Sequence, residues 1–164
     1  THRYVKYVPG WQQAEIKKEV EGYIQSDDIV RSLPVMNGSQ TSVAQILQRK
    51  PIVCYFTGRS SSTKRATYDW IRENGFPESE IFFQPDTVEL SKMGFGSGNE
   101  WRAKLLEFLF PYIESIVDDN EELLDYIRGY QGTIYLLGKS GQSQRPNVFH
   151  CPDWSSVVEE ISLK

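Results

Sequence analysis

The fold signal is strongest in the stretch PIVCYFTGRSSSTKRATYDWIRENGFP, which spans residues 51–77. It begins with a short apolar run at 52–56 that is rich in β-branched and aromatic residues. A helical pattern of apolar side chains follows over 60–74, and Gly75 is expected to stop the helix. A strand followed at once by a helix is the first half of a strand–helix–strand unit.

The rest of the chain repeats this alternation. Further strands are expected at 81–83, 115–117, 133–137 and 147–151, and further helices over 100–113, after Asn120 and after Asp153. In the helix at 100–113 one apolar stripe is expected to face the core, and it consists of Trp101, Leu105, Phe108, Leu109 and Tyr112. Strands that alternate with helices predict an α/β fold, a three-layer α/β/α sandwich with a mostly parallel, Rossmann-like sheet.

The N-terminal part of the chain has a different pattern. An alternating run at 3–8 and a helical pattern at 12–25 precede a break, and a short helix is expected over 41–49. We therefore divide the chain into a small helical, N-terminal or cap-like segment at 1–33 and an α/β core at 34–164, packed as one compact domain. Two segments rich in glycine and serine are expected to be mobile loops: 85–99 and 138–147.

The composition excludes several classes of protein. The 164 residues carry 18 basic and 22 acidic side chains, a formal net charge of −4, and 39% are hydrophobic. Such a chain is an ordinary globular domain without the basic field that holds nucleic acid. No apolar run approaches the roughly 20 residues of a membrane span, and the first residues lack the apolar core of a signal peptide. Cys54 and Cys151 lie far apart and are expected to be buried, inert thiols in a reducing, cytoplasmic compartment.

Polar residues follow two of the expected strands, at the edge where ligands bind to an open parallel sheet. Thr57, Gly58 and Arg59 follow the strand at 52–56, and Asp118 and Asp119 follow the strand at 115–117. If these strands are neighbours, a hydroxyl, free backbone N–H groups and two carboxylates share one crevice. The hydroxyl and the N–H groups suit phosphate oxygens, and the carboxylates suit Mg²⁺.

A lysine near this crevice would offset the charge of a transferring phosphoryl group. Lys104 is the first candidate and Lys92 the second. Each feature also has a purely structural interpretation. Thr57-Gly58 is a common turn, the acidic pair suits the start of a helix, and Lys104 is typical of a solvated helix face. Arg59 fits an anion site and a surface position equally well.

These residues resemble motifs of the haloacid dehalogenase (HAD) superfamily of phosphatases. In that superfamily a strand ends in Thr-Gly-Arg, and the next helix ends in a phrase such as Trp-Leu-x-x-x-Gly-Phe-Pro. The corresponding phrases here are Val53-Cys54-Tyr55-Phe56-Thr57-Gly58-Arg59 and Trp70-Ile71-Arg72-Glu73-Asn74-Gly75-Phe76-Pro77. Ser115-Ile116-Val117-Asp118-Asp119-Asn120 resembles the superfamily's acidic metal motif, and Val35-x-x-Gly38 resembles the segment before its Thr-Gly-Arg strand.

The resemblance implies a Mg²⁺-dependent phosphatase that acts on a small phosphorylated substrate. Thr57, with Gly58 and Arg59, would bind the transferring phosphoryl group. Asp118 and Asp119 would hold Mg²⁺, and Lys104, or Lys92 in its place, would be the phosphate lysine.

The superfamily's nucleophile is missing. It lies in an Asp-x-Asp motif at the end of a central apolar strand, and no Asp-x-Asp occurs in these 164 residues. The run at 3–8 is too polar to replace that strand, so two unpaired ladders and an open cleft are expected.

Two explanations follow. The favoured one is a partial HAD-like phosphatase domain whose nucleophile strand lies outside this sequence. The alternative is a catalytically inactive HAD-like module that binds phosphate or protein. A receiver-like signalling domain is a weaker third class, because no other expected strand ends in the aspartate that such a domain needs.

Overall fold

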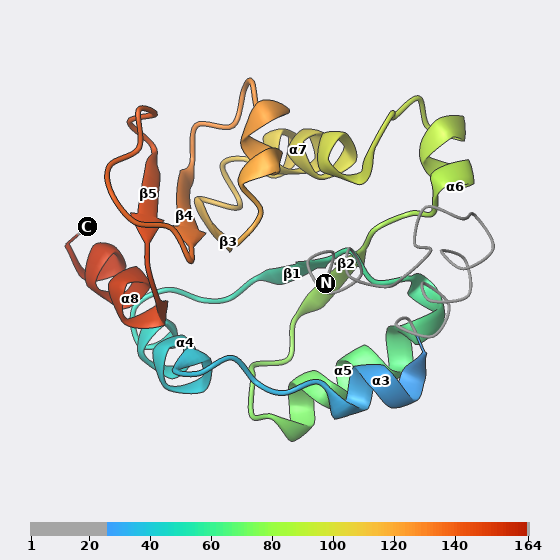
Figure 1. Ribbon diagram of the computed structural model, residues 1–164, viewed down its shortest axis with the longest axis horizontal. Helices are drawn as coiled ribbons and strands as arrows, with labels where there is room; N and C mark the ends of the chain where they lie inside the picture. Colours follow the sequence, from blue (N-terminus) through green and yellow to red (C-terminus); the bar gives the residue numbers. More distant parts are fainter. Residues whose placement is uncertain (1–25, 164) are drawn as a thin grey trace, which may run out of the picture.

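The computed structural model describes residues 26–163, which form a mixed α/β arrangement of short strands and helices (Figure 1). The α-helices are α3 (Asp27–Ser32), α4 (Ser39–Leu47), α5 (Lys64–Glu73), α6 (Thr87–Lys92), α7 (Gly98–Leu109) and α8 (Trp154–Ser162). Two 3₁₀ helices accompany them, η1 (Ser61–Thr63) and η2 (Glu121–Asp125). Within this range no helix has both the length and the apolar composition needed to cross a membrane.

The strands form two parallel sheets. β1 (Cys54–Thr57) pairs with β2 (Glu80–Phe83), and β3 (Ser115–Asp118) pairs with β4 (Thr133–Leu137), which pairs with β5 (Val148–Cys151). Among residues 26–163, no strand is paired with the second edge of β1 or of β3. The expected α/β class with parallel strands is confirmed, whereas the strands are divided between two small sheets instead of forming the one continuous sheet that was expected.

One apolar core joins the two sheets. Its buried residues come from α7, η2 and the β3–β5 sheet, and include Leu106, Leu123 and Ile134. Cys54 and Phe56 of β1 pack against this cluster, as does Ile116 of β3. Figure 1 shows β1 and β2 crossing the middle of the view, with α7 and the β3–β5 sheet on one side and α3 and α5 on the other. β1 and β3 therefore share a core without sharing a hydrogen-bond ladder.

A second apolar cluster lies where α4 and α8 meet the β3–β5 sheet. Ile46 of α4, Val157 and Ile161 of α8, and Tyr135, Leu137 and Cys151 of the sheet are its buried members. Trp154, the first residue of α8, packs against it. This cluster fixes the start of α8 beside the carboxyl ends of β4 and β5.

Local sequence signals set several boundaries correctly. β4 has the expected bounds, and α5 ends just before Gly75, whose φ of 70° lies in the left-handed region that glycine adopts without strain. α8 begins after Asp153, whose carboxylate accepts a hydrogen bond from the Ser156 N–H at 2.9 Å.

The predicted core stripe of α7 is only partly correct: Leu109 packs against the core, whereas Phe108 and Tyr112 do not face it. The helix is capped by Ser97, one turn before Glu100, and it ends at Leu109 because Phe110 precedes Pro111 and such residues disfavour helical backbone. Its buried residues are Ala103 and Leu106. Phe108 is 80% exposed, and Tyr112, which lies beyond the helix, is 85% exposed. The buried face of α7 is therefore centred on Ala103 and Leu106, with Leu109 at its end, and not on the full stripe inferred from spacing.

Two other expectations need correction. The segment after Asn120 is the 3₁₀ helix η2, although Asn120 caps it as expected by accepting from the Glu122 N–H at 3.1 Å. The expected loop at 85–99 contains α6, which begins with a capping box between Asp86 and Glu89. The expected elements at 3–8 and 12–25 lie outside the described residues.

Candidate functional site

A cavity of about 210 Å³ lies at the carboxyl end of β3. Its wall contains Val117, Asp118 and Asp119 from β3 and the turn after it, together with Met36, Phe56, Arg102, Leu137 and Trp154. The carboxyl ends of parallel strands are where ligands bind in α/β proteins. Both predicted metal residues therefore meet in one cavity, at the expected end of the sheet.

Asp118 is held by a network of charged and amide groups. Its Oδ2 lies 3.1 Å from Arg102 Nη1, and its Oδ1 accepts a hydrogen bond from the Asn120 N–H at 2.8 Å. The side chains of Asp118 and Arg102 are only 11% and 17% exposed. Burial raises the pKa of Asp118 above the usual aspartate value, while Arg102 and the Asn120 N–H act in the opposite direction.

Asn99 completes this network from the first turn of α7. Its Oδ1 accepts hydrogen bonds from Asn120 Nδ2 at 2.8 Å and from Arg102 Nη2 at 3.3 Å. The start of α7 is thus tied to the turn after β3. Sequence reasoning missed Arg102 and Asn99; the only available signal was their spacing of three residues on a helix that precedes the acidic motif.

Asp119 differs from Asp118 in its surroundings. It is exposed, and its carboxylate has no hydrogen-bond or ion-pair partner among residues 26–163. No cluster of three or more histidine, cysteine or acidic residues suited to a metal occurs in that range. Two carboxylates nevertheless fit Mg²⁺, which takes hard oxygen ligands and keeps several waters.

The residues after β1 have other partners. Thr57 Oγ1 accepts a hydrogen bond from the Arg59 N–H at 3.2 Å, and the Thr57 carbonyl accepts from the Gln84 N–H at 2.9 Å. The Arg59 guanidinium lies 5.7 Å from the centre of the Trp70 ring, and burial lowers its pKa. The cavity lining includes Phe56 of β1 but does not include Thr57, Gly58 or Arg59. In this arrangement Thr57 closes a turn.

Lys104 lies away from the acidic pair. It is 54% exposed, and its Nζ is 2.8 Å from Glu107 Oε2. Glu107 Oε1 also accepts hydrogen bonds from the N–H groups of Arg128 and Gly129, at 2.8 and 2.7 Å. Lys92, in the last turn of α6, is exposed too. The cation that lies beside Asp118 is Arg102.

The Glu107 contacts give a pH prediction. The hydrogen bond from Lys104, followed by that from the Gly129 N–H, lowers the pKa of Glu107 from 4.5 to about 2. A lowered pKa means that the ionised form stabilises the fold above pH 4.5 and that this contribution disappears as the pH falls toward 2. Allowing for solvent screening, Glu107→Gln should lower the free energy of unfolding by about 1–2 kcal/mol at pH 7. Urea unfolding should show this difference shrinking as the pH approaches 2.

Glu114→Gln is the matched control for this experiment. Glu114 is 71% exposed and its Oε2 lies 3.3 Å from Lys50 Nζ, so its loss should change stability by less than about 0.5 kcal/mol. Equal losses at pH 7 from the two variants would contradict the role given to Glu107.

The prediction of two buried thiols is confirmed for Cys151 and only in part for Cys54. Cys151 is buried, Cys54 is half-buried, and both are free. Burial raises the pKa of each thiol to about 11, so both are protonated at neutral pH. Neither can serve as a ready nucleophile.

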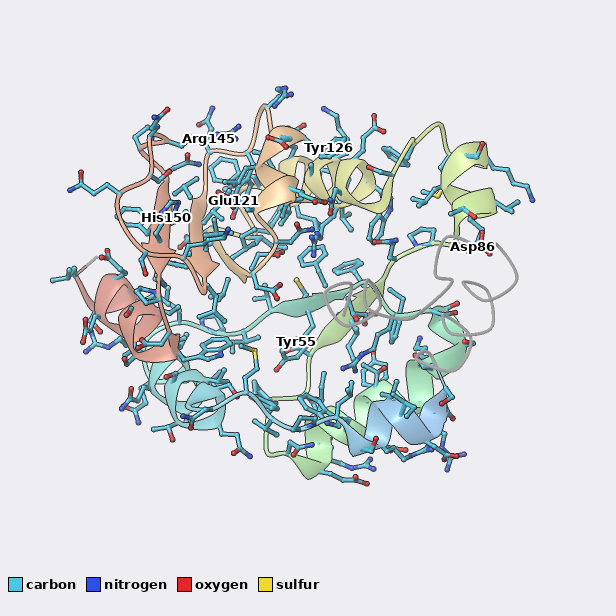
Figure 2. All side chains as sticks on the ribbon, in the orientation of Figure 1. Tyr55, Asp86, Glu121, Tyr126, Arg145 and His150 are labelled. Atoms are coloured by element: carbon cyan, nitrogen blue, oxygen red, sulfur yellow. The ribbon has the colours of Figure 1, made fainter. Side chains whose placement is uncertain are left out.

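A larger, more open depression lies elsewhere on the molecule. It measures about 430 Å³ and is lined by Glu121, Glu122, Leu124, Asp125 and Arg145. Figure 2 shows Glu121, Arg145 and His150 on the part of the molecule that carries η2, β4 and β5, far from Asp86. Its carboxylates are exposed, and Glu121 forms an ion pair with Lys139. The smaller cavity is the better candidate because it contains a buried carboxylate.

No protein-family model matches the chain, and no curated protein is significantly similar to it in sequence. The candidate site therefore depends on its own geometry: Asp118 and Asp119 share a cavity with Arg102, whereas Thr57 and Lys104 have other partners.

Proposed function

We propose that the chain is a HAD-like domain that carries the metal-binding side of a Mg²⁺-dependent phosphomonoester hydrolase for small phosphorylated substrates. The observation that supports this most directly is the position of Asp118, which is the last residue of β3, largely buried, and beside the free carboxylate of Asp119 on one cavity. Carboxylates that end a parallel strand are well placed to hold a metal beside a ligand.

Asp118 and Asp119 would hold Mg²⁺, which when bound would neutralise phosphate charge. We assign to Arg102 the role that the family resemblance gives to Lys104, because Arg102 already contacts Asp118 and lines the cavity. A guanidinium can also hold a phosphate with two parallel hydrogen bonds. Thr57 Oγ1 accepts from the Arg59 N–H, so its O–H is still able to donate to a phosphate oxygen, but Thr57 does not line this cavity.

The nucleophile would come from a strand outside residues 26–163. In that range β1 and β3 each have one unpaired edge, and side chains of both pack against the same core. A strand between them would join the two sheets into the Rossmann-like sandwich that the resemblance implies. Uncharged parallel edges that lack a partner strand among the described residues, such as Cys54–Phe56, are uncommon in a finished sheet, which supports this proposal.

Metal binding to the 164-residue chain tests the proposal. Mn²⁺, used as a paramagnetic substitute for Mg²⁺, should broaden the backbone amide resonances of residues 118–120 first, and excess Mg²⁺ should restore them. Asp119→Asn should weaken this binding at least tenfold, because one of two carboxylate ligands is lost and no described contact of the fold depends on it. Asp125→Asn, the same change on an exposed residue of η2, should leave binding unchanged.

The same chain should not hydrolyse p-nitrophenyl phosphate, because it lacks the nucleophilic aspartate. Mg²⁺-dependent turnover by the purified chain would contradict this account. Broadening centred on residues other than 118–120, or an Asp119→Asn variant with unchanged affinity, would refute the metal site itself.

An inactive binding module on the same scaffold is the second candidate. It is favoured by the ion pair between Arg102 and Asp118, which satisfies the buried carboxylate without any metal. Under this alternative, adding an apolar strand that ends in Asp-x-Asp to the chain would complete the sheet and give no turnover.

A further inference from the structure

Trp154 carries a buried hydrogen-bond donor that has no acceptor. Among residues 26–163, only Trp154 Nε1 and Thr67 Oγ1 are buried side-chain polar atoms without a hydrogen-bond partner. Buried indole N–H groups normally find an acceptor, as Trp70 shows by donating to the Leu33 carbonyl at 2.8 Å. An orphan donor of this kind needs an explanation.

The residue that carries the orphan donor lines the candidate site. Trp154 lines the same cavity as Asp118, Asp119 and Arg102. It is the first residue of α8 and follows β5 after Pro152 and Asp153, so it lies at the same end of the sheet as Asp118.

The position of Trp154 is fixed from two sides. The Asp153 carboxylate holds the first turn of α8 through the Ser156 N–H at 2.9 Å. Gly38 is a neighbour of Trp154: a Cβ added to it would lie 3.8 Å from Trp154 Cβ, an ordinary van der Waals contact. The side chain of Trp154 also packs against the apolar cluster of α4, α8 and the β3–β5 sheet, which limits its movement.

The polar groups of this cavity suit an oxyanion bound with a cation. Asp118 and Arg102 already pair with each other, whereas the Asp119 carboxylate has no partner among residues 26–163 and the Trp154 N–H has no acceptor. A phosphoryl group can accept from the Trp154 N–H while another of its oxygens contacts a cation held by Asp119. Met36, which also lines the cavity, is 57% exposed, and its unbranched side chain can adapt its shape to a ligand there.

We infer that Trp154 is a ligand-binding residue whose indole N–H donates a hydrogen bond to an oxygen of a phosphate-type anion in the cavity beside Asp118 and Asp119. This inference rests on the proposed function for the cation, and it adds a residue that sequence motifs did not indicate. Trp154→Phe removes the donor and keeps a large aromatic ring, so it is the most informative substitution.

The indole N–H resonances of the chain provide the test. Adding inorganic phosphate in the presence of Mg²⁺ should shift the Trp154 indole resonance downfield in a saturable way, with sodium chloride at equal ionic strength as the blank. The Trp70 resonance is an internal reference and should stay in place, because its N–H already has an acceptor. Trp154→Phe should weaken phosphate binding about tenfold, the usual effect of losing a hydrogen bond to a charged group. Tyr126→Phe, which removes a donor from a partly exposed ring, should not.

The outcomes separate this inference from the proposed function. If Mn²⁺ broadens residues 118–120 and phosphate leaves the Trp154 resonance unmoved, the inference is overturned and the metal site stands. If phosphate moves that resonance without any metal binding, the inference stands as an anion site and the proposed function fails. If neither metal nor phosphate has an effect, both are overturned.

Discussion

Asp118→Ala should lower the free energy of unfolding by about 3–5 kcal/mol, which is a large part of the stability of a domain of this size. The substitution leaves the Arg102 guanidinium, whose side chain is only 17% exposed, without its carboxylate. It also removes the acceptor of the Asn120 N–H. An uncompensated charge and an unpaired donor in a largely buried position are both costly. Urea unfolding at pH 7 measures the loss.

Two further variants separate the cost of the orphaned charge from the value of the pair. Arg102→Met combined with Asp118→Leu removes both charges and should return stability to within about 1 kcal/mol of the unmodified chain, because a buried ion pair contributes little net stability. Asp119→Ala, the adjacent change on an exposed carboxylate, should cost less than about 0.5 kcal/mol. If Asp118→Ala lowers the free energy of unfolding no more than Asp119→Ala does, the ion pair between Arg102 and Asp118 is not buried in solution.

This pair also bears on function. Burial raises the pKa of Asp118 more than Arg102 and the Asn120 N–H lower it. The folded chain therefore holds the ionised carboxylate less favourably than the unfolded chain does, which reduces stability. Buried groups with shifted pKa values occur often at functional sites, although structural ion pairs shift pKa values as well. The metal titration, which reads binding directly, decides between these two meanings.

The sequence predicted correctly those features that depend on residues close together along the chain. β4, the cap of α8 at Asp153, the stop at Gly75 and the Asn120 cap all depend on residues within a few positions. The site residues Asp118 and Asp119 could be named for the same reason, since strand ends can be read locally. The crevice that they were expected to share with Thr57 is not found as predicted, because β1 and β3 lie in different sheets and the cavity contains Phe56 of β1 but not Thr57.

What the sequence could not show depends on contacts between distant segments. The division into two sheets follows from which strand edges meet, and this is not encoded in the period of any one strand. The sequence favours Lys104 as the cation near Asp118, whereas the structure places Arg102 there, two residues earlier on α7. Choosing between them requires knowing which face of α7 points toward β3. The partner of Thr57 Oγ1 is the Arg59 N–H, a turn contact that the Thr-Gly phrase allows equally with a phosphate role.

Both the core and the site therefore depend on the orientation of α7. Two substitutions on this helix, one at Leu106 and one at Phe108, test that orientation. Leu106 is completely buried, whereas Phe108, which the apolar spacing had placed in the core, is 80% exposed. Leu106→Ala should lower the free energy of unfolding by about 2–5 kcal/mol, since it leaves a cavity in the cluster that also packs β1 and β3.

Phe108→Ala should cost less than about 0.5 kcal/mol, although it deletes the larger side chain. If the helix were rotated so that the expected stripe faced inward, the order would reverse, and Phe108→Ala would cost about 3–5 kcal/mol. Urea unfolding of both variants separates the two orientations by several kcal/mol. The same rotation would carry Arg102 away from Asp118, so a reversed order would remove the ion pair and, with it, the cation assigned to the site.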